Sequence, residues 1–376
     1  MRLALPSLIL FLYILFSLII WLPCRPWVKI AMAITFFLIG LKYVIYVYLG
    51  GSFIAPGFPF WALVLMEFFY SAMIMLVFLL IIKDLLALFF FISRLFGSSW
   101  HLPLAIGIRS LILIVMALAL SGYATWESMR VPRVKTVNIA LAGLPAELDG
   151  FSIVQLTDLH VGPLLHGKWL EQAVNKTNAL KTDLIVLTGD LIDGTPVALK
   201  NDIAPYGKLH ARYGVYGVTG NHEYYFGAMR WEAVFANLGI EMLDNEYRAI
   251  SVNGKNLILT GVPDEAALRF GEKGPVYTML QNMTQKDTVI LLQHRPSRLT
   301  SDSPVDLQLS GHTHGGHIFF LKWLVAAFND GLVSGLVDFN GPKLYISSGT
   351  GLWSGFSCRL GVPPEITQLI LRRQEG

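Results

Sequence analysis

The sequence contains very little cysteine and little charge. Only Cys24 and Cys358 occur among 376 residues, so a framework of several disulfides is excluded. Charged residues make up 15% of the chain and hydrophobic residues 54%, which is far from the composition of an ordinary soluble domain. The length is sufficient for two domains.

Charge is scarcest in the first third of the chain. Residues 1–120 contain seven basic and two acidic side chains, which leaves 22 basic and 24 acidic side chains for residues 121–376. The second part is therefore nearly neutral and has no basic stripe, so we expect no nucleic-acid partner. The first part has the long uncharged runs that are typical of segments crossing a bilayer.

Four apolar segments predict a transmembrane region at residues 1–126. Each is long enough to cross a hydrocarbon core of about 30 Å at a rise of about 1.5 Å per residue. We expect Lys42, Glu67 and Arg109, which lie in these segments, to be paired or to reach the interface, because an isolated charge in lipid is costly. The predicted helices are residues 3–22, 30–49, 60–82 (with an extension to 96 as an alternative) and 104–126. Residues 127–133 are a linker to a domain at 134–376.

The basic residues also bear on orientation. The loop between the first and second spans and the loop between the third and fourth spans both contain basic residues, and these two loops would lie on the same side of the membrane. The loop between the second and third spans, on the other side, has no charge. The positive-inside rule therefore places both chain ends outside the cytoplasm. Arg130, Arg133 and Lys135, just after the fourth span, favour the opposite orientation.

Residues 134–376 alternate between apolar strands and helical segments. This order predicts an α/β domain with mixed sheets. Helices are expected at 168–180, 197–212 and 229–238, and the strands include 151–156, 183–187, 215–218, 289–292 and 307–309. Each of these five strands is followed by side chains that can bind a metal, and such loops converge at one edge of a sheet. The candidates are Asp158, His160, Asp190, Asn221, His294, His312 and His314.

The segment Ser310–His317 is the most unusual of these. It places three histidines within six positions among glycines, and imidazole is a good ligand for divalent transition metals. The alternative is a polar loop that happens to be rich in histidine. Carboxylate and amide oxygens mixed with imidazoles suit two divalent ions better than one structural zinc, which would prefer cysteines.

These motifs together resemble the calcineurin-like metallophosphoesterase family. The resemblance is carried by Asp158-x-His160, Gly189-Asp190, Gly220-Asn221-His222-Glu223, His294 and Gly311-His312-x-His314. The flanking GHTHGG and PPEI sequences further resemble a membrane-associated bacterial subgroup. That subgroup includes lipid-linked phosphodiesterases such as UDP-2,3-diacylglucosamine hydrolases. The resemblance implies a four-layer α/β (α+β) fold, a β-sandwich flanked by helices, after an all-α transmembrane bundle in a bacterial inner membrane.

The resemblance also implies roles for the candidate residues. One metal would be held by Asp158, His160, Asp190 and His314, and the second by Asp190, Asn221, His294 and His312. Asp190 would bridge the two ions, which would be manganese, zinc or iron. His222 and Asp190 would be the catalytic residues. His317 stands where close relatives often have glutamine, and we expect it at the edge of the pocket.

The expected function is metal-dependent hydrolysis of a phosphoester or pyrophosphate by a hydroxide that bridges the metals, on a lipid or lipid-linked substrate. One alternative is a phosphatase or phosphodiesterase for soluble nucleotides with the membrane part as an anchor only. Another is a membrane sensor or transporter with a regulatory phosphoesterase domain. Arg295 and Arg359 are either substrate contacts or surface charge. The apolar segment Ile318–Phe328 is a lid, a membrane contact or part of the core.

Overall fold

The computed structural model describes residues 4–283 and 287–374 and divides into two compact units. Leu3, the expected start of the first span, and the last two residues of the predicted domain lie outside the described residues. One unit contains the chain up to Glu127 together with Ser354–Cys358, and the other contains Ser128–Trp353 and the chain from Arg359 onward. Ser354–Cys358 thus belongs to the first unit although it is flanked by the second.

The first unit is helical. Three of its helical segments, at Ala4–Trp21, Phe60–Leu95 and Ile106–Met129, are long and apolar enough to cross a membrane. The second expected span is instead a pair of helices bent by 54°, so the number of spans is four if this pair crosses as one. The bend follows Gly40, a residue with low helix propensity. The helices are α1 (Ala4–Ser17), η1 (Ile19–Trp21), α2 (Pro26–Gly40), α3 (Lys42–Tyr48), α4 (Phe60–Leu95) and α5 (Ile106–Met129).

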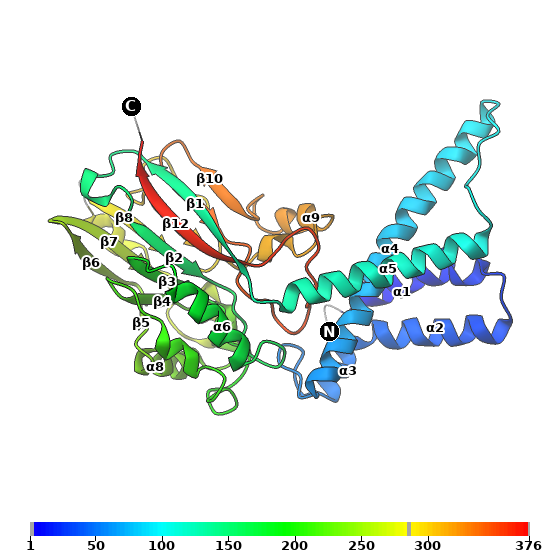
Figure 1. Ribbon diagram of the computed structural model, residues 1–376, viewed down its shortest axis with the longest axis horizontal. Coiled ribbons are helices and arrows are strands. Elements are labelled where there is room, and N and C mark those ends of the chain that lie inside the picture. The colour runs from blue at the N-terminus through cyan, green and yellow to red at the C-terminus, as the bar shows by residue number, and fades with distance from the viewer. Residues whose placement is uncertain (1–3, 284–286, 375–376) are drawn as a thin grey trace. The chain divides into compact units, whose positions relative to one another are not determined.

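The second unit contains two six-stranded mixed sheets (Figure 1). The first has the order β1-β12-β2-β3-β4-β5 and the second the order β10-β11-β9-β8-β7-β6. The first comprises β1 (Arg133–Leu141), β2 (Ser152–Leu156), β3 (Leu184–Thr188), β4 (Val215–Val218), β5 (Glu241–Met242) and β12 (Glu365–Arg373). The second comprises β6 (Glu246–Val252), β7 (Lys255–Gly261), β8 (Thr288–Leu292), β9 (Leu307–Ser310), β10 (Gly335–Asp338) and β11 (Lys343–Ile346). Strands β2 to β5 run parallel, as do β7, β8, β9 and β11.

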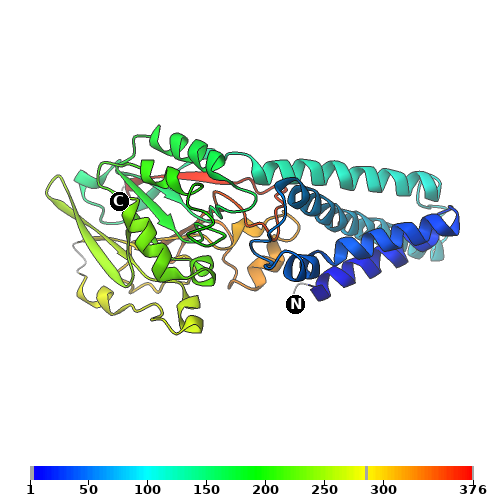
Figure 2. The same cartoon turned by 90° about the horizontal axis from the view of Figure 1, so that it is seen from below.

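Alternation along β3 shows how the layers pack. Leu184 and Val186 join the core between the two sheets, whereas Ile185 and Leu187 join the core under the helices, because successive strand residues point to opposite faces. Helices α6 (Gly167–Asn178) and α8 (Ala228–Asn237) cover this outer face (Figure 2). The outer face of the second sheet packs against short segments that include η5 (Thr278–Asn282). The expected sandwich of mixed sheets flanked by helices is confirmed.

Two local predictions need correction. Residues 197–212 were expected to form a helix, but the segment contains only the short 3-10 helix η3 (Ala204–Lys208). Pro205 has no backbone N–H to donate, and Gly207 disfavours a continuous helix. The core interpretation of Ile318–Phe328 is also wrong. Only Ile318 is buried, and α9 (Lys322–Ala327) has no buried residue.

Candidate metal centre

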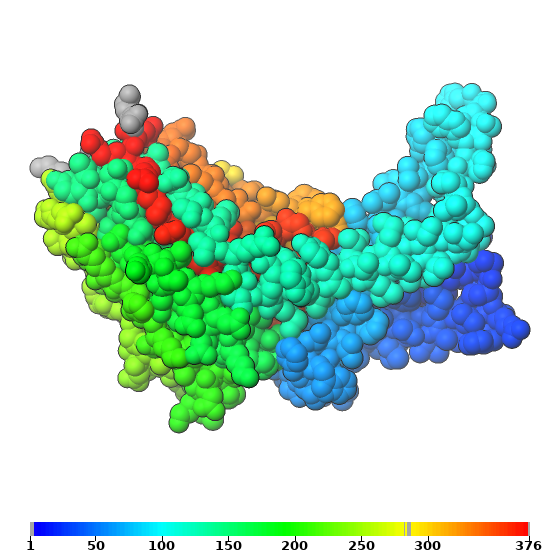
Figure 3. Space-filling view, in the orientation of Figure 1, coloured from blue at the N-terminus to red at the C-terminus, as the bar shows by residue number. Residues whose placement is uncertain are grey.

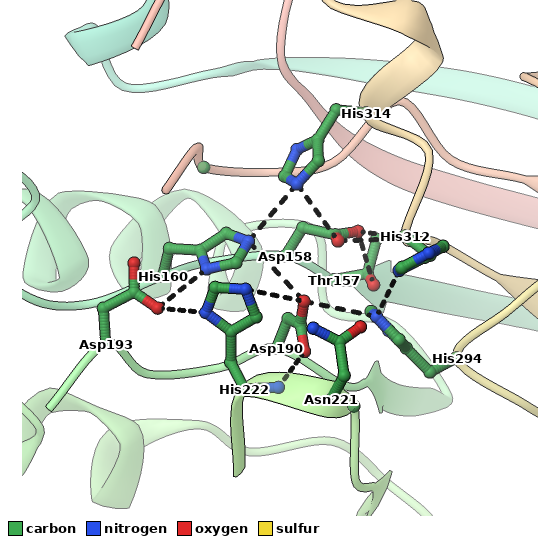
Figure 4. A network of polar contacts seen from close by, with 12 residues as sticks. Thr157, Asp158, His160, Asp190, Asp193, Asn221, His222, His294, His312 and His314 are labelled. Carbon is green, nitrogen blue, oxygen red and sulfur yellow. Dashed lines mark hydrogen bonds and ion pairs between the residues drawn. The ribbon is translucent and has the colours of Figure 1, made fainter. Parts of the chain in front are cut away.

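The candidate ligands lie in loops at the ends of five strands and all meet at one place (Figure 4). Asp158 and His160 follow β2, Asp190 follows β3, and Asn221 follows β4 at the start of the short helix α7 (Asn221–Tyr225). His294 follows β8, and the two ligands of the histidine-rich loop follow β9. Six of the seven are buried and His312 is half-buried.

Among the described residues, three groups of donor atoms lie close enough together to hold a metal ion, and one of these is His160 with Asp193 and His222. The other two groups consist of candidate ligands alone. One contains Asp158, His160 and His314, and the other contains Asp190, His294 and His312. In the first, Nε2 of His314 lies 3.3 Å from Nε2 of His160 and 3.5 Å from Oδ1 of Asp158. In the second, Nε2 of His294 lies 3.3 Å from Oδ2 of Asp190 and 3.2 Å from Nδ1 of His312. Oδ2 of Asp190 is also 3.8 Å from Nε2 of His160, so this carboxylate adjoins both groups.

The hydrogen bonds of two imidazoles test whether these groups fit a cation. Nδ1 of His294 lies 2.8 Å from the carbonyl oxygen of Thr188, which can only accept, so Nδ1 carries the proton. In neutral His294 the lone pair of Nε2 would therefore face the Asp190 carboxylate. Burial lowers the pKa of His294, but Asp190 raises it to about 10, so this nitrogen needs a proton or a cation beside the carboxylate. Nδ1 of His160 likewise faces the Asp193 carboxylate at 3.1 Å, which directs its Nε2 lone pair toward His314. Lone pairs so directed repel unless a cation or a proton lies between them, so the donor set fits divalent ions.

The backbone of the site adopts a rarely populated conformation. Five candidate ligands have positive φ angles between 46° and 70°, which costs non-glycine residues on the order of 1 kcal/mol each. The five are Asp158, His160, Asp190, His312 and His314. A Cβ atom at Gly220 would lie 2.2 Å from Oδ1 of Asp190, and one at Gly311 would lie 2.3 Å from Oδ2 of Asp158. Close packing of these loops thus requires glycine at both positions.

Two carboxylates behind the ligands organise the site. Oδ1 of Asp193 accepts hydrogen bonds from Nδ1 of His160 at 3.1 Å and from Nδ1 of His222 at 2.5 Å. Glu223 accepts from the backbone N–H groups of Gly220, Asp190 and Leu191 and so ties the loop after β4 to the loop after β3. The sequence reasoning missed Asp193. Its signal was the spacing Asp190-x-x-Asp193, which places a second carboxylate beside the bridging candidate.

Burial and the facing charges set the pKa values around His222. Burial alone would lower the pKa of His222, but Asp190 and Asp193 raise it to about 9. Burial would raise the pKa of Asp193, but the neighbouring His160 and His222 hold it at about 2. Burial raises the pKa of Asp158. These charges favour a protonated imidazole at His222 beside an ionised carboxylate at Asp193.

The two arginines differ in position. Arg295 donates through Nε to Asp264 at 2.8 Å, and its two Nη atoms reach His312 and Asn221, both at 3.1 Å. Arg359 is fully buried and donates to the backbone oxygens of Gly351 at 2.7 Å and His314 at 3.3 Å. The surface-charge interpretation is therefore wrong for Arg359. His317 is half-buried, and its ring centroid lies 4.9 Å from that of His314.

Comparison with known proteins identifies the family. The family model for calcineurin-like phosphoesterases matches residues 151–316, which include all the candidate ligands. An uncharacterised metallophosphoesterase of Campylobacter jejuni is 33% identical over 317 residues, covering 82% of this chain and 81% of that protein. The chain belongs to the calcineurin-like phosphoesterase family. A transmembrane protein with a metallophosphoesterase domain from Bos taurus is 33% identical over 71% of this chain and 63% of its own length. An uncharacterised metallophosphoesterase of Helicobacter pylori is 34% identical over 70% and 71%.

Membership in the calcineurin-like phosphoesterase family confirms several expectations. The protein is a metal-dependent phosphoester hydrolase, and its cofactors are two divalent metal ions of open identity. The three apolar helices, together with relatives named as transmembrane proteins, indicate a membrane protein. The individual ligand assignments stay predictions.

Proposed function

We propose that this membrane protein hydrolyses a phosphoester or pyrophosphate bond in a lipid or lipid-linked substrate, and that its apolar helices anchor it in the bilayer. The convergence of seven oxygen and nitrogen donors beside a protonated histidine supports the hydrolytic part. An exposed apolar segment directly after the histidine-rich loop supports the lipid part. Hydrolysis of soluble nucleotides is the alternative.

The two donor groups supply the metal sites in this proposal. One ion would be held by Asp158, His160, Asp190 and His314, and the other by Asp190, Asn221, His294 and His312. When bound, two divalent ions supply Lewis acidity toward phosphate oxygens and lower the pKa of water, so that a nucleophile exists at neutral pH.

His222 is the proposed general acid. Its Nδ1 is engaged by Asp193 at 2.5 Å, whereas its Nε2 faces the donor cluster, 3.8 Å from Oδ2 of Asp190. Nε2 can therefore donate its proton to the oxygen that leaves phosphorus. Proton donation of this kind contributes about 10²–10⁴-fold to the rate.

Arg295 is the proposed phosphate contact. Its Nη1 donates to Nε2 of His312. If Nδ1 of His312 binds a cation, the proton of the neutral imidazole moves to Nε2, and Nη1 then loses its acceptor. The guanidinium stays held by Asp264 and can turn its two Nη groups toward a phosphate, a geometry for which arginine is well suited.

The apolar surface beside the site comprises Phe319, Trp323, Leu324 and Phe328. Their side chains are exposed, Trp323 by 69% and Phe328 by 81%, and α9 lies on the surface of its unit (orange in Figure 3). This surface is tied to the end of the histidine-rich loop, because the Phe319 N–H donates to the Leu360 carbonyl at 2.9 Å and the Leu360 N–H donates to the His317 carbonyl at 3.1 Å. Four large exposed apolar side chains within ten positions are unusual on a soluble surface and suit contact with acyl chains.

Two classes of substrate separate the lipid proposal from its alternative. Substituting serine at Phe319, Phe320 and Trp323 should weaken hydrolysis of phospholipids and lipid-linked pyrophosphates, and spare bis-para-nitrophenyl phosphate. Val197→Ser is the matched control, because Val197 is 89% exposed in the same unit and lies outside this surface. Equal losses on both substrate classes would count against lipid recognition. Efficient turnover of soluble nucleotides alone would favour the nucleotide alternative.

We further propose a bacterial inner-membrane location, with the catalytic unit outside the cytoplasm. The distribution of basic residues in the first 126 residues supports this orientation. A cysteine introduced at the exposed Lys200 should react with a membrane-impermeant thiol reagent in intact cells. Labelling only after cell lysis would place the catalytic unit in the cytoplasm.

A further inference from the structure

Five residues late in the sequence are held by the helical unit rather than by the unit that surrounds them in the chain. These residues, Ser354–Cys358, are called the docked segment below. Its backbone is bound at two points. Nζ of Lys42 donates to the carbonyl oxygen of Gly355 at 2.8 Å, and the N–H of Ser357 donates to Oε2 of Glu67 at 2.9 Å.

The groups that bind the docked segment form a buried ion pair. Lys42 and Glu67 are 2% and 1% exposed, and Nζ lies 2.9 Å from Oε1 and 3.1 Å from Oε2. Tyr46 donates to Oε1 at 2.7 Å, and Nζ lies 4.0 Å from the ring centroid of Tyr70. A buried pair is tolerated when its remaining donors and acceptors are satisfied. The backbone groups of the docked segment provide part of that satisfaction.

Both flanks of the docked segment reach the metal centre within the other unit. Before it, the Gly351 N–H donates to the Asp158 carbonyl at 2.9 Å, and the Trp353 ring centroid lies 6.2 Å from that of His222. After it, Arg359 donates to the His314 carbonyl at 3.3 Å and closes the loop onto the Gly351 carbonyl at 2.7 Å. Residues 351–359 thus begin at a contact with Asp158, pass through the docked segment and end at a contact with His314.

We propose that Lys42 and Glu67 are positioning residues that clamp the docked segment and thereby fix the loop supporting Asp158 and His314. The clamp holds the docked segment through two backbone groups, and the packing of the Phe356 ring against Tyr70 adds to it. The ion pair then acts on the candidate metal site through the covalent chain on both sides of the docked segment. This inference rests on the proposed assignment of Asp158 and His314 as metal ligands.

The test uses the full-length protein in lipid nanodiscs. Lys42→Met removes the donor to the Gly355 carbonyl, and Glu67→Ala removes the acceptor of the Ser357 N–H. Phe356→Ala loosens the docked segment while leaving the ion pair intact, since the Phe356 ring packs 6.4 Å from that of Tyr70. Lys83→Met is the control, because Lys83 pairs with Asp84 and donates to the Ser17 carbonyl, and both residues lie in the helical unit outside the docked segment.

Three measurements are made on each variant: amide hydrogen exchange at 354–358, Mn²⁺ affinity by calorimetry, and kcat and KM for bis-para-nitrophenyl phosphate. We expect faster exchange and Mn²⁺ binding weakened about 10–100-fold, the usual effect of losing support behind a ligand. Excess Mn²⁺ should restore most of kcat, and Lys83→Met should match the wild type. Glu67→Gln, which keeps an acceptor for the Ser357 N–H, should show a smaller effect than Glu67→Ala.

Faster exchange with unchanged Mn²⁺ affinity and kinetics would overturn the clamp, as would weaker Mn²⁺ binding without faster exchange. Circular dichroism identifies any ion-pair variant that loses helical structure, and Phe356→Ala then decides the question. Failure of the clamp can be told apart from failure of the proposed function. If the wild-type protein binds Mn²⁺ but hydrolyses no phosphoester, the proposed function fails, while hydrogen exchange and Mn²⁺ affinity still test the clamp.

Discussion

Replacing Asp193 with asparagine tests how the site delivers a proton. Oδ1 of Asp193 accepts from both His160 and His222, and the side chain is fully buried. Asparagine keeps the shape and can still accept from both imidazoles through Oδ1, but it loses the negative charge, and hydrogen bonds to a neutral acceptor are weaker than those to a carboxylate. The substitution therefore weakens the group that keeps His222 protonated and directs Nε2 toward the site, and it also weakens the orientation of His160.

The roles of His222 and His160, the two partners of Asp193, set the expected loss of activity. Loss of general-acid help costs about 10²–10⁴-fold in rate, and loss of support behind a metal-binding histidine costs about 10–100-fold in metal affinity or activity. We expect kcat/KM to fall about 10³-fold at saturating Mn²⁺, with Mn²⁺ binding weakened about tenfold.

The assay compares two phosphodiesters. Para-nitrophenolate leaves without a proton, whereas an alkoxide needs one, so Asp193→Asn should lose much more activity on an alkyl phosphodiester than on bis-para-nitrophenyl phosphate. Asp202→Asn is the control, because Asp202 accepts from the Gly167 N–H away from the site and should affect neither substrate. Equal losses on the two substrates, or full activity on both, would refute the role given to Asp193 and His222.

Three further predictions concern single side chains. Asp190→Asn or His312→Ala should abolish hydrolysis while circular dichroism shows the fold retained, and full activity in either would remove the dinuclear assignment. Arg295→Gln should lower kcat/KM about 10–100-fold, mainly through KM, since a hydrogen bond to a charged group contributes about 1.5–3 kcal/mol; an unchanged KM would place Arg295 outside the phosphate pocket. The pKa of Glu232 is raised to about 7, first by burial and then by Asp244 and Glu272. The folded state therefore binds this proton more tightly, and stability falls as pH rises from about 4.5 through 7. After allowance for partial exposure, Glu232→Gln should stabilise the protein by about 1 kcal/mol at pH 8 and leave it unchanged at pH 4.5, as measured by thermal unfolding. Equal effects at both pH values would exclude the charge as the cause.

The candidate ligands could be predicted because each lies directly after a strong apolar strand. Asp158, Asp190 and His294 all follow strands of four or five buried residues, and strand order then brings them together. Short or half-exposed strands gave no comparable signal. Strand β5 has two residues, and only two of the seven residues of β6 are buried, so both were missed.

Contacts between distant parts of the chain could not be predicted. Pairing of Lys42 was expected, but its partner Gly355 is 313 positions away, and no local periodicity connects them. Asp193 lies three positions after Asp190, but its role depends on how the chain turns after β3 to face two imidazoles. The second span was read as continuous because its residues are apolar throughout, and composition does not report a bend between α2 and α3.

The number of divalent ions bound per purified chain tests the central claim most directly. Elemental analysis of the full-length protein after dialysis against trace Mn²⁺ should give two ions per chain in the wild type. It should give at most one in Asp190→Asn, because Oδ2 of Asp190 adjoins both donor groups. A single ion in an active wild-type protein, or two ions retained with hydrolysis in Asp190→Asn, would contradict a two-metal site organised around this carboxylate.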